Sequence, residues 1–367
     1  MLDRRRLRFI VLLGVVSLFA DWLYESMRSV APQYLAQLGA TAAFVGFVFG
    51  LGDALGYAAR FVTGPLADRR GGYWLETFAG YGMQLAAVAG LVFATDIWQA
   101  AALIFLERFS KALRTPARDV LIASAGGEKA RGSAFGIHAA LDQIGAMAGA
   151  SMATAILFFG HTPRDVFAVS LLPGAAALFV LLYAYKTGGV SPKRRAATRI
   201  TAPLLSFALA QFLLGASLVH ISLYMYKISS APWLASLLYL ISMAAEVPLS
   251  YLLGRLADRH SWVLSTAPLA SAAAALFFTL GWPHLVAGAV LYSLVTSYAD
   301  VVAKAHASKY GGAAALGVVN AAWGLGLLAG GSAYGLLVDA GAEQFVVYAS
   351  FITALASLLL IWKRGGS

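Results

Sequence analysis

The stretch GPLADRR at residues 64–70 returns as GRLADRH at residues 254–260. The second copy begins 190 residues after the first, which is about half of the 367-residue chain. Each copy follows the second apolar segment of its half. Two matches to Gly-x-Leu-Ala-Asp-Arg at corresponding positions indicate that the chain is an internal duplication of two similar halves.

The composition around this repeat is that of a membrane protein. The chain is 60% hydrophobic and 12% charged, whereas about 25% of residues are charged in soluble domains. Apolar runs of roughly 20 residues recur from end to end, and that length crosses the ~30 Å hydrocarbon core of a bilayer. The chain has no cysteine, which excludes disulfides, thiol catalysis and cysteine-ligated metals.

The apolar runs predict an all-α membrane protein with twelve transmembrane helices. A polar linker at 188–199 divides them into an N-terminal six-helix bundle, 1–187, and a C-terminal one, 200–367. The predicted helices span 8–36, 41–64, 73–94, 98–117, 131–158, 166–186, 200–227, 232–254, 262–281, 284–305, 312–338 and 345–362.

Basic residues concentrate in alternate connections between these helices. This pattern follows the positive-inside rule and predicts that both termini are cytoplasmic. It also explains the net charge of +10 without nucleic acid as a partner. The basic start followed by an apolar run resembles a signal peptide, but the run continues into charges, so we expect it to be the first helix. The basic stretches lie at 4–8, 68–70, 191–199, 254–260 and 362–364.

Twelve helices, the six-plus-six division and the repeated loop motif resemble the major facilitator superfamily of secondary transporters. The stretch RGSAFGIHAALDQIGAMAGA at 131–150 is similar to the start and body of that family's fifth helix. Many drug antiporters of the family carry Gly-Pro on this helix, whereas here Gly149 is followed by Ala150. The resemblance implies that the two loop motifs brace the halves when the inner side is closed. The gate residues would be Gly64, Asp68, Arg69, Gly254, Asp258 and Arg259.

Three charges interrupt the first predicted helix. Asp21, Glu25 and Arg28 fall within about 60° of one another at 100° per residue. A charge facing lipid at the bilayer centre costs about 2.5–3.5 kcal/mol, so this stripe is expected to line a central cavity together with Trp22. Glu25 is a further proton-coupling candidate and can pair with Arg28. Asp21, a turn away, is expected to lack a full partner and to exchange a proton. The alternative is a structural ion-pair cluster.

Two further regions of the N-terminal half carry candidate residues. On the second helix, small residues alternate with Asp53 and Tyr57 on a face that we expect to touch the other half; Asp53 is a further proton-coupling candidate, unless it is simply held by a neighbour. The resemblance implies that the fourth helix faces the first across the cavity. Arg108 on the fourth helix and Asp142 on the fifth helix are expected to pair. The cavity candidates of these two regions are Tyr57, Glu107, Arg108, Lys111 and Asp142.

The C-terminal half is poorer in charge. The 190-residue offset maps Asp21 onto Gln211, which is therefore expected to face the cavity. Glu246 either contacts substrate or binds a neighbouring helix. Asp300 and Lys304 are expected to satisfy each other. His220 lies about 180° from Gln211 around the predicted helix, and no ligand or relay role is expected for it.

These features predict a transporter rather than an enzyme. There is no serine–histidine–aspartate arrangement, metal-ligand motif or phosphate loop at meaningful spacing. We expect a proton-coupled secondary transporter, a monomer without metal or other cofactor, moving a small amphipathic, zwitterionic or cationic organic solute. Its expected place is the cytoplasmic membrane of a prokaryote, with uptake or efflux left open. The alternatives are a passive uniporter and a metal-ion or anion transporter of the same fold.

Overall fold

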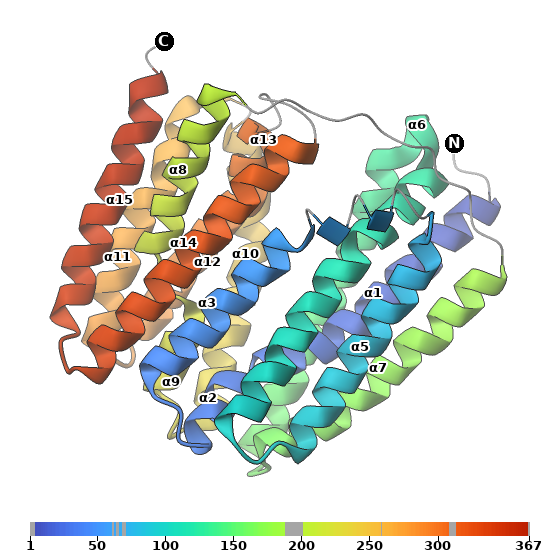
Figure 1. The fold of residues 1–367 in the computed structure, drawn as a ribbon, viewed down its shortest axis with the longest axis horizontal. Helices are drawn as coiled ribbons and strands as arrows, with labels where there is room; N and C mark the ends of the chain where they lie inside the picture. Colours follow the sequence, from blue (N-terminus) through green and yellow to red (C-terminus); the bar gives the residue numbers. More distant parts are fainter. Residues whose placement is uncertain are drawn as a thin grey trace. The chain divides into compact units, whose positions relative to one another are not determined.

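The computed structural model describes residues 4–60, 62–63, 66–67, 71–187, 201–257, 259–307 and 313–365, with backbone alone at 127–133, 313–314 and 363–365. Across these ranges every regular element is a helix (Figure 1). The chain forms two compact units. One comprises Met1–Tyr34 and Ala59–Ala196, and the other Leu35–Ala58 and Ala197–Ser367. Packing therefore differs from the predicted sequence halves at residues 35–58.

The first unit is built on four helices, and a short fifth begins in it. Local capping fixes where two of them start. Asp96 accepts the backbone N–H groups of Trp98 and Gln99 ahead of α6, and Thr162 forms a capping box with Asp165 ahead of α7. The helices are α1 (Arg4–Arg28), α5 (Tyr73–Phe93), α6 (Ile97–Phe158) and α7 (Pro163–Lys186), with α2 (Ala31–Gln37) following α1.

The helix α6 is 62 residues long and covers both the fourth and fifth predicted helices. Its first part runs antiparallel to α1, because Arg114 contacts Asp21 and the earlier residue Lys111 contacts the later residue Tyr24. The predicted gap between 117 and 131 is therefore helical rather than a loop.

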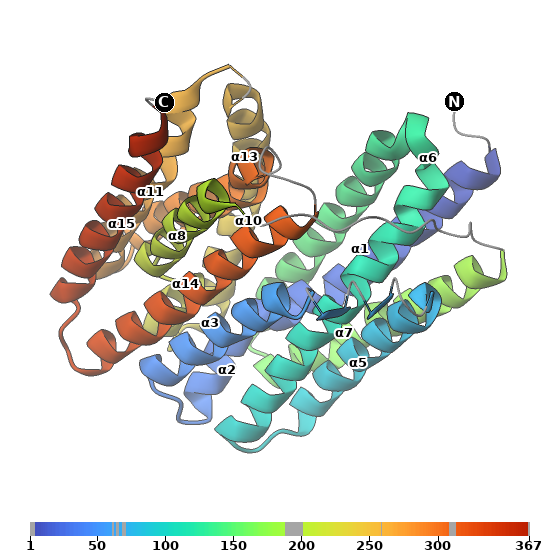
Figure 2. The same ribbon diagram turned by 45° about the horizontal axis from the view of Figure 1, so that its top comes forward.

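Its second part runs parallel to α1. Gly145 packs on the backbone of Leu18, and the later Gly149 packs on the backbone of Trp22. The chain therefore reverses direction within α6, as Figures 1 and 2 show. A Cβ built on Gly145 would lie 2.0 Å from the Leu18 carbonyl oxygen, so only glycine permits this approach.

The second unit combines one early helix with the C-terminal part of the chain. The predicted helix 200–227 is broken here, because Leu218 and His220 adopt extended backbone between α8 and α9. The helices are α3 (Ala42–Ala58), α8 (Ala202–Ser217), α9 (Ile221–Lys227), α10 (Pro232–Ala257), η1 (Ser261–Ser265), α11 (Thr266–Leu280), α12 (Leu285–Ser297), η2 (Tyr298–Ala303), α13 (Lys304–Ala307), α14 (Ala313–Asp339) and α15 (Gln344–Gly365).

The helices α3 and α14 lie side by side in both views (Figures 1 and 2), and small residues permit their close approach. A Cβ on Gly46 would lie 2.0 Å from the carbonyl oxygen of Gly331, and one on Gly50 would lie 2.7 Å from the Cα of Leu328. Asp339 at the end of α14 accepts the first backbone N–H groups of α3. The prediction that this face of the second helix contacts the C-terminal half is confirmed.

Nine helices of the described ranges are long and apolar enough to cross a membrane, and α3 is a shorter apolar helix. The two remaining predicted spans correspond to α5 and to the first part of α6. Four charges at Glu107, Arg108, Lys111 and Arg114 depress the hydropathy of that part of α6. A helix with this many charges has to be shielded from lipid by protein. Its face toward α1 is therefore a candidate for a functional site.

Candidate functional site

Asp21 lies in the interface between α1 and the first part of α6. It is 5% exposed, and its Oδ1 lies 3.7 Å from Nη2 of Arg114, which is 1% exposed. The expectation that Asp21 lacks a partner is wrong. The partner is Arg114 of α6, which helical geometry alone did not bring together with Asp21. Seven residues separate Arg114 from Glu107, so both lie on one face of α6.

One turn along α1, Tyr24 gathers three cations. The ring centroid lies 3.8 Å from the Lys111 ammonium, 5.0 Å from the Arg108 guanidinium and 5.9 Å from that of Arg28. Arg28 also donates to the Tyr24 hydroxyl at 3.1 Å. Cation–π contacts strengthen when desolvated, and Arg108 is 3% exposed. The three predicted cavity cations therefore share one aromatic residue.

Two glutamates accompany these cations. Glu107 is fully buried, and in the described part of the chain neither of its carboxyl oxygens has a hydrogen bond. Its nearby charges include Arg114, Lys111 and Arg28. Glu25 is also buried. The predicted pairing of Glu25 with Arg28 stays a prediction, since the hydrogen bond described for Arg28 goes to Tyr24.

Asp142 reaches the same cluster from the second part of α6. Its carboxyl group lies close to that of Asp21, and the positive charges of Arg118 and Lys111 act on it. The predicted Arg108–Asp142 pair stays a prediction. Two neighbouring carboxyl groups favour sharing one proton, because two negative charges close together repel each other.

A hydrogen-bond network centred on Ser17 lies beside this cluster. Ser17 contacts Nε2 of His138 at 2.6 Å and accepts from Arg118 at 3.2 Å. Arg118 also pairs with Asp119 at 2.9 Å. Trp22, half-buried on α1, donates to the sulfur of Met152 at 3.3 Å.

In the second unit, Asp53 of α3 contacts His220 at the break between α8 and α9. Oδ2 of Asp53 lies 3.0 Å from Nε2 of His220. Nδ1 of His220 accepts the backbone N–H of Ser222 at 3.1 Å and contacts its hydroxyl at 2.8 Å. Because Nδ1 is an acceptor, the ring is neutral and its proton is on Nε2, where it is donated to Asp53.

Sequence reasoning did not foresee the contact of His220 with Asp53. The ring is fully buried and flanked by Phe49 and Tyr292, with centroids 5.8 and 6.0 Å away. A possible sequence signal was a histidine that follows Ser217 inside an apolar run, a position at which a polar side chain can cap a new helix.

The other predicted residues of this unit lie elsewhere. Gln211 is fully buried in α8 and neighbours Tyr298. Glu246 is half-buried in α10, where its backbone carbonyl accepts from Ser297. Tyr57 lies at the end of α3 beside Gly324 of α14. The predicted Asp300–Lys304 pair is confirmed.

Most predicted gate residues are outside the described ranges, namely Gly64, Asp68, Arg69 and Asp258. Gly254 lies in α10 next to Val301, and Arg259 is exposed just after that helix. Among the described residues there is no cluster of three or more histidine, aspartate or glutamate side chains that suits a metal ion.

A family model identifies the family of this chain. Residues 10–229 match the Major Facilitator Superfamily. Uncharacterised proteins of Mycobacterium bovis and Mycobacterium tuberculosis are 44% identical over 177 residues. That match covers 48% of this chain and 43% of each relative, so the similarity spans less than half of their length.

Solved structures resemble the whole chain. The nucleoside transporter NupG has a TM-score of 0.79 at 15% identity, covering 96% of this chain and 99% of its own. The peptide transporter POT, in complex with sulfate, has a TM-score of 0.74 at 15% identity, covering 96% and 92%. A bacterial homologue of the human lysosomal transporter Spinster has a TM-score of 0.64 at 15% identity, covering 98% and 95%.

Proposed function

Because this chain belongs to the Major Facilitator Superfamily, we propose that it is a secondary active transporter that moves a small organic solute by alternating access. Duplicated halves of this kind bind substrate near the bilayer midplane and rock around it. The neighbouring structures include nucleoside and peptide transporters, and at this identity they support the fold without fixing the substrate. The role proposed here is transport and not catalysis.

The buried cluster between α1 and α6 is the observation that carries the proposal. Asp21, Glu107 and Arg114 are each 5% exposed or less. Burying charge costs several kcal/mol per ion unless it is paired, so a purely structural helix pair would be more stable with apolar residues. Ionisable groups inside a membrane protein mark substrate or proton pathways.

Proton coupling is the second part of the proposal. Asp21 and Asp142 together provide a site for one transferable proton. The ion pair with Arg114 stabilises the negatively charged form of Asp21. Glu25 contributes to the local field. Asp53 with His220 forms a second candidate, because a neutral imidazole can accept a proton near physiological pH.

The substrate is proposed to be amphipathic, zwitterionic or cationic. The Tyr24 face supplies aromatic surface and cations, and Glu107 supplies a buried carboxyl group without a described hydrogen bond. An ammonium group on the solute would suit Glu107, whereas an anionic group would suit Lys111 or Arg108. Trp22, Tyr57, Gln211 and Glu246 stay in the proposed cavity set.

The remaining parts of the proposal concern gating and placement. The repeated loop motifs, including Asp68 and Asp258, are proposed to brace the inward-closed state. Carboxylates do this by meeting helix N-termini or arginines. Both termini are proposed to be cytoplasmic, in the cytoplasmic membrane of a prokaryote, and the protein is proposed to be monomeric.

A two-step experiment tests the proposal. Purified protein is screened by thermal shift at pH 5.5 and 7.5 against nucleosides, dipeptides, amino acids and quaternary amines, since a ligand stabilises the state that binds it. The best stabiliser is then used for uptake into proteoliposomes, with and without an imposed pH gradient. Accumulation above equilibrium only with the gradient is expected. Equal flux in both conditions would identify a passive uniporter, and no flux of any stabiliser would contradict transport.

A further inference from the structure

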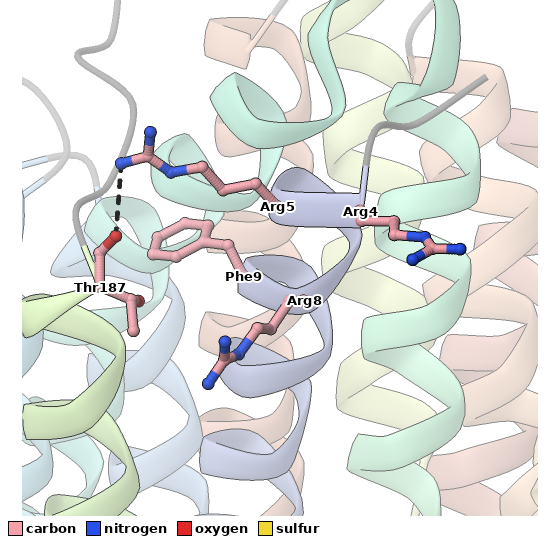
Figure 3. Close-up of a pocket in the computed structure, with 5 residues that line it drawn as sticks. All are labelled: Arg4, Arg5, Arg8, Phe9 and Thr187. Atoms are coloured by element: carbon pink, nitrogen blue, oxygen red, sulfur yellow. Dashed lines mark hydrogen bonds between the residues drawn. The ribbon is translucent and has the colours of Figure 1, made fainter.

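A pocket lies at the start of α1, beside the end of α7 (Figure 3). It is lined by Arg4, Arg5, Arg8, Phe9 and Thr187. The three arginines are exposed, whereas Phe9 is buried. Arg5 reaches toward Thr187, and Arg4 extends on the opposite side of the helix start (Figure 3). The pocket therefore combines an apolar floor with a cationic rim.

The charge around this pocket favours an anion. Residues 1–9 carry four arginines and one aspartate, and the first turn of α1 has no acidic residue. The free N–H groups of a first helical turn add a partial positive charge. Arg5 donates to the Thr187 carbonyl at 3.5 Å, a long hydrogen bond that leaves most of its capacity available.

Aromatic contacts indicate the depth of the pocket in the membrane. Phe9 meets Trp74 edge-on at 5.9 Å, and Trp74 meets Tyr185 at 5.1 Å. Arg8 lies 5.6 Å above the ring of Tyr183 and hydrogen-bonds its hydroxyl group. Tryptophan and tyrosine gather at the level of the lipid headgroups, so the arginines lie where lipid phosphates lie.

Exposed apolar side chains are close in sequence to the pocket residues on both helices. Leu7 and Val11 on α1 and Leu182 on α7 are all exposed. A free anion would use only the arginines, whereas a phospholipid has a phosphate for the rim and acyl chains for these side chains. Apolar side chains on the two helices that border the pocket therefore favour the lipid.

We propose that this pocket binds the phosphate headgroup of an anionic phospholipid, whose acyl chains lie along the exposed apolar side chains of α1 and α7. Basic pockets beside membrane-spanning helices recognise such headgroups. Under the proposed orientation the lipid belongs to the cytoplasmic leaflet. The site is separate from the cluster around Asp21 and does not depend on what is transported.

The test counts bound lipid on delipidated full-length protein by native mass spectrometry. Phosphatidylglycerol is titrated against phosphatidylcholine, and inorganic phosphate is added in a third arm. Wild-type protein should retain phosphatidylglycerol preferentially. Each arginine near the surface should contribute about fivefold in affinity, so Arg5→Gln with Arg8→Gln should weaken phosphatidylglycerol binding about 25-fold.

Arg255→Gln is the matched control. Arg255 lies 5.6 Å above the ring of Tyr251 and donates to its hydroxyl at 3.2 Å. This repeats the Arg8–Tyr183 arrangement with one further arginine, Arg259, four residues away, whereas Arg8 has both Arg4 and Arg5 beside it in the pocket. The control variant should bind phosphatidylglycerol as the wild type does. If the double variant does not fold, Arg5→Gln alone replaces it, with a fivefold loss expected.

Three outcomes would overturn the proposal. Equal retention of phosphatidylcholine would show that headgroup charge is not recognised. Displacement of the lipid by an equal concentration of inorganic phosphate would identify a free-anion site. Unchanged phosphatidylglycerol binding by a folded Arg5 variant would place the lipid elsewhere.

Discussion

Asp21 in the first unit and Asp53 in the second are both acids within apolar helices, yet they have different partners. Asp21 faces Arg114 at 3.7 Å, a cation that stays charged at any physiological pH. Asp53 faces His220 at 3.0 Å, a ring that can gain or lose a proton. At Asp21 a change of charge has to come from the carboxyl groups themselves, whereas at Asp53 the imidazole is able to supply it.

The two sites also differ in what they hold together. Arg114 joins α1 to α6 within a cluster of several charges, so its removal affects many groups. His220 joins α3 to the start of α9, where it also accepts the Ser222 N–H. Its removal affects one cap, one hydrogen bond and the packing of one ring between Phe49 and Tyr292. The comparison therefore predicts that substitutions at Asp21 or Arg114 in the first unit change transport and stability more than substitutions at Asp53 or His220 in the second.

The largest expected effect is on transport. Asp21→Asn should abolish accumulation driven by a pH gradient while downhill exchange survives, because Asp142 is left without its proton-sharing partner. Asp53→Asn should reduce accumulation and alter its pH dependence without abolishing it. Uptake in proteoliposomes measures both, with Asp300→Asn as an exposed acid control. The opposite ranking of the two variants would move the coupling site to the second unit.

Next comes the stability of the charged cluster. Arg114→Met should cost about 3–5 kcal/mol, because breaking a buried ion pair leaves an uncompensated charge. The measurement is thermal unfolding in detergent. Adding Asp21→Asn to this variant should restore part of the loss. A double variant as unstable as the sum of the two single variants would show that Asp21 and Arg114 are not coupled.

His220→Ala should have a smaller effect on stability. Loss of the cap on α9 costs about 1 kcal/mol, and loss of the bond to Asp53 costs about 1–3 kcal/mol. His220→Gln retains an N–H for Asp53 and should recover part of the stability, but it cannot titrate. A pH profile of transport that is unchanged between pH 5 and 8 in His220→Gln would exclude the imidazole from proton coupling.

The smallest effect should follow Lys304→Gln. Its ion pair with Asp300 is one helical turn apart and substantially exposed, and such pairs contribute about 0.3–0.5 kcal/mol. The unfolding temperature should stay within experimental error of the wild type. If Lys304→Gln lost as much stability as His220→Ala, solvent exposure would not explain the difference in strength between these two interactions.

The sequence by itself determined the fold class and the chemistry available. Apolar runs and the repeated loop motif predicted a helical membrane protein of this family, and the comparisons confirm both. The polar stripe on the first helix was predicted from the 3.6-residue period. The period alone decides which side chains share a face, and the structure buries Asp21 and Glu25 of this stripe.

Tertiary structure decided which groups meet. The helical period gives a face but not the neighbour that the face packs against, so Arg114 was not recognised as the partner of Asp21. The placement of α3 with α14 likewise depends on glycines that face each other only after folding.

His220 shows the same limit for a different reason. Its predicted direction assumed one continuous helix from 200 to 227 and 100° per residue from Gln211. The extended backbone at Leu218 and His220 interrupts that rotation. The sequence therefore supplied a histidine and an aspartate 167 residues apart, and only the broken helix brings them within 3.0 Å.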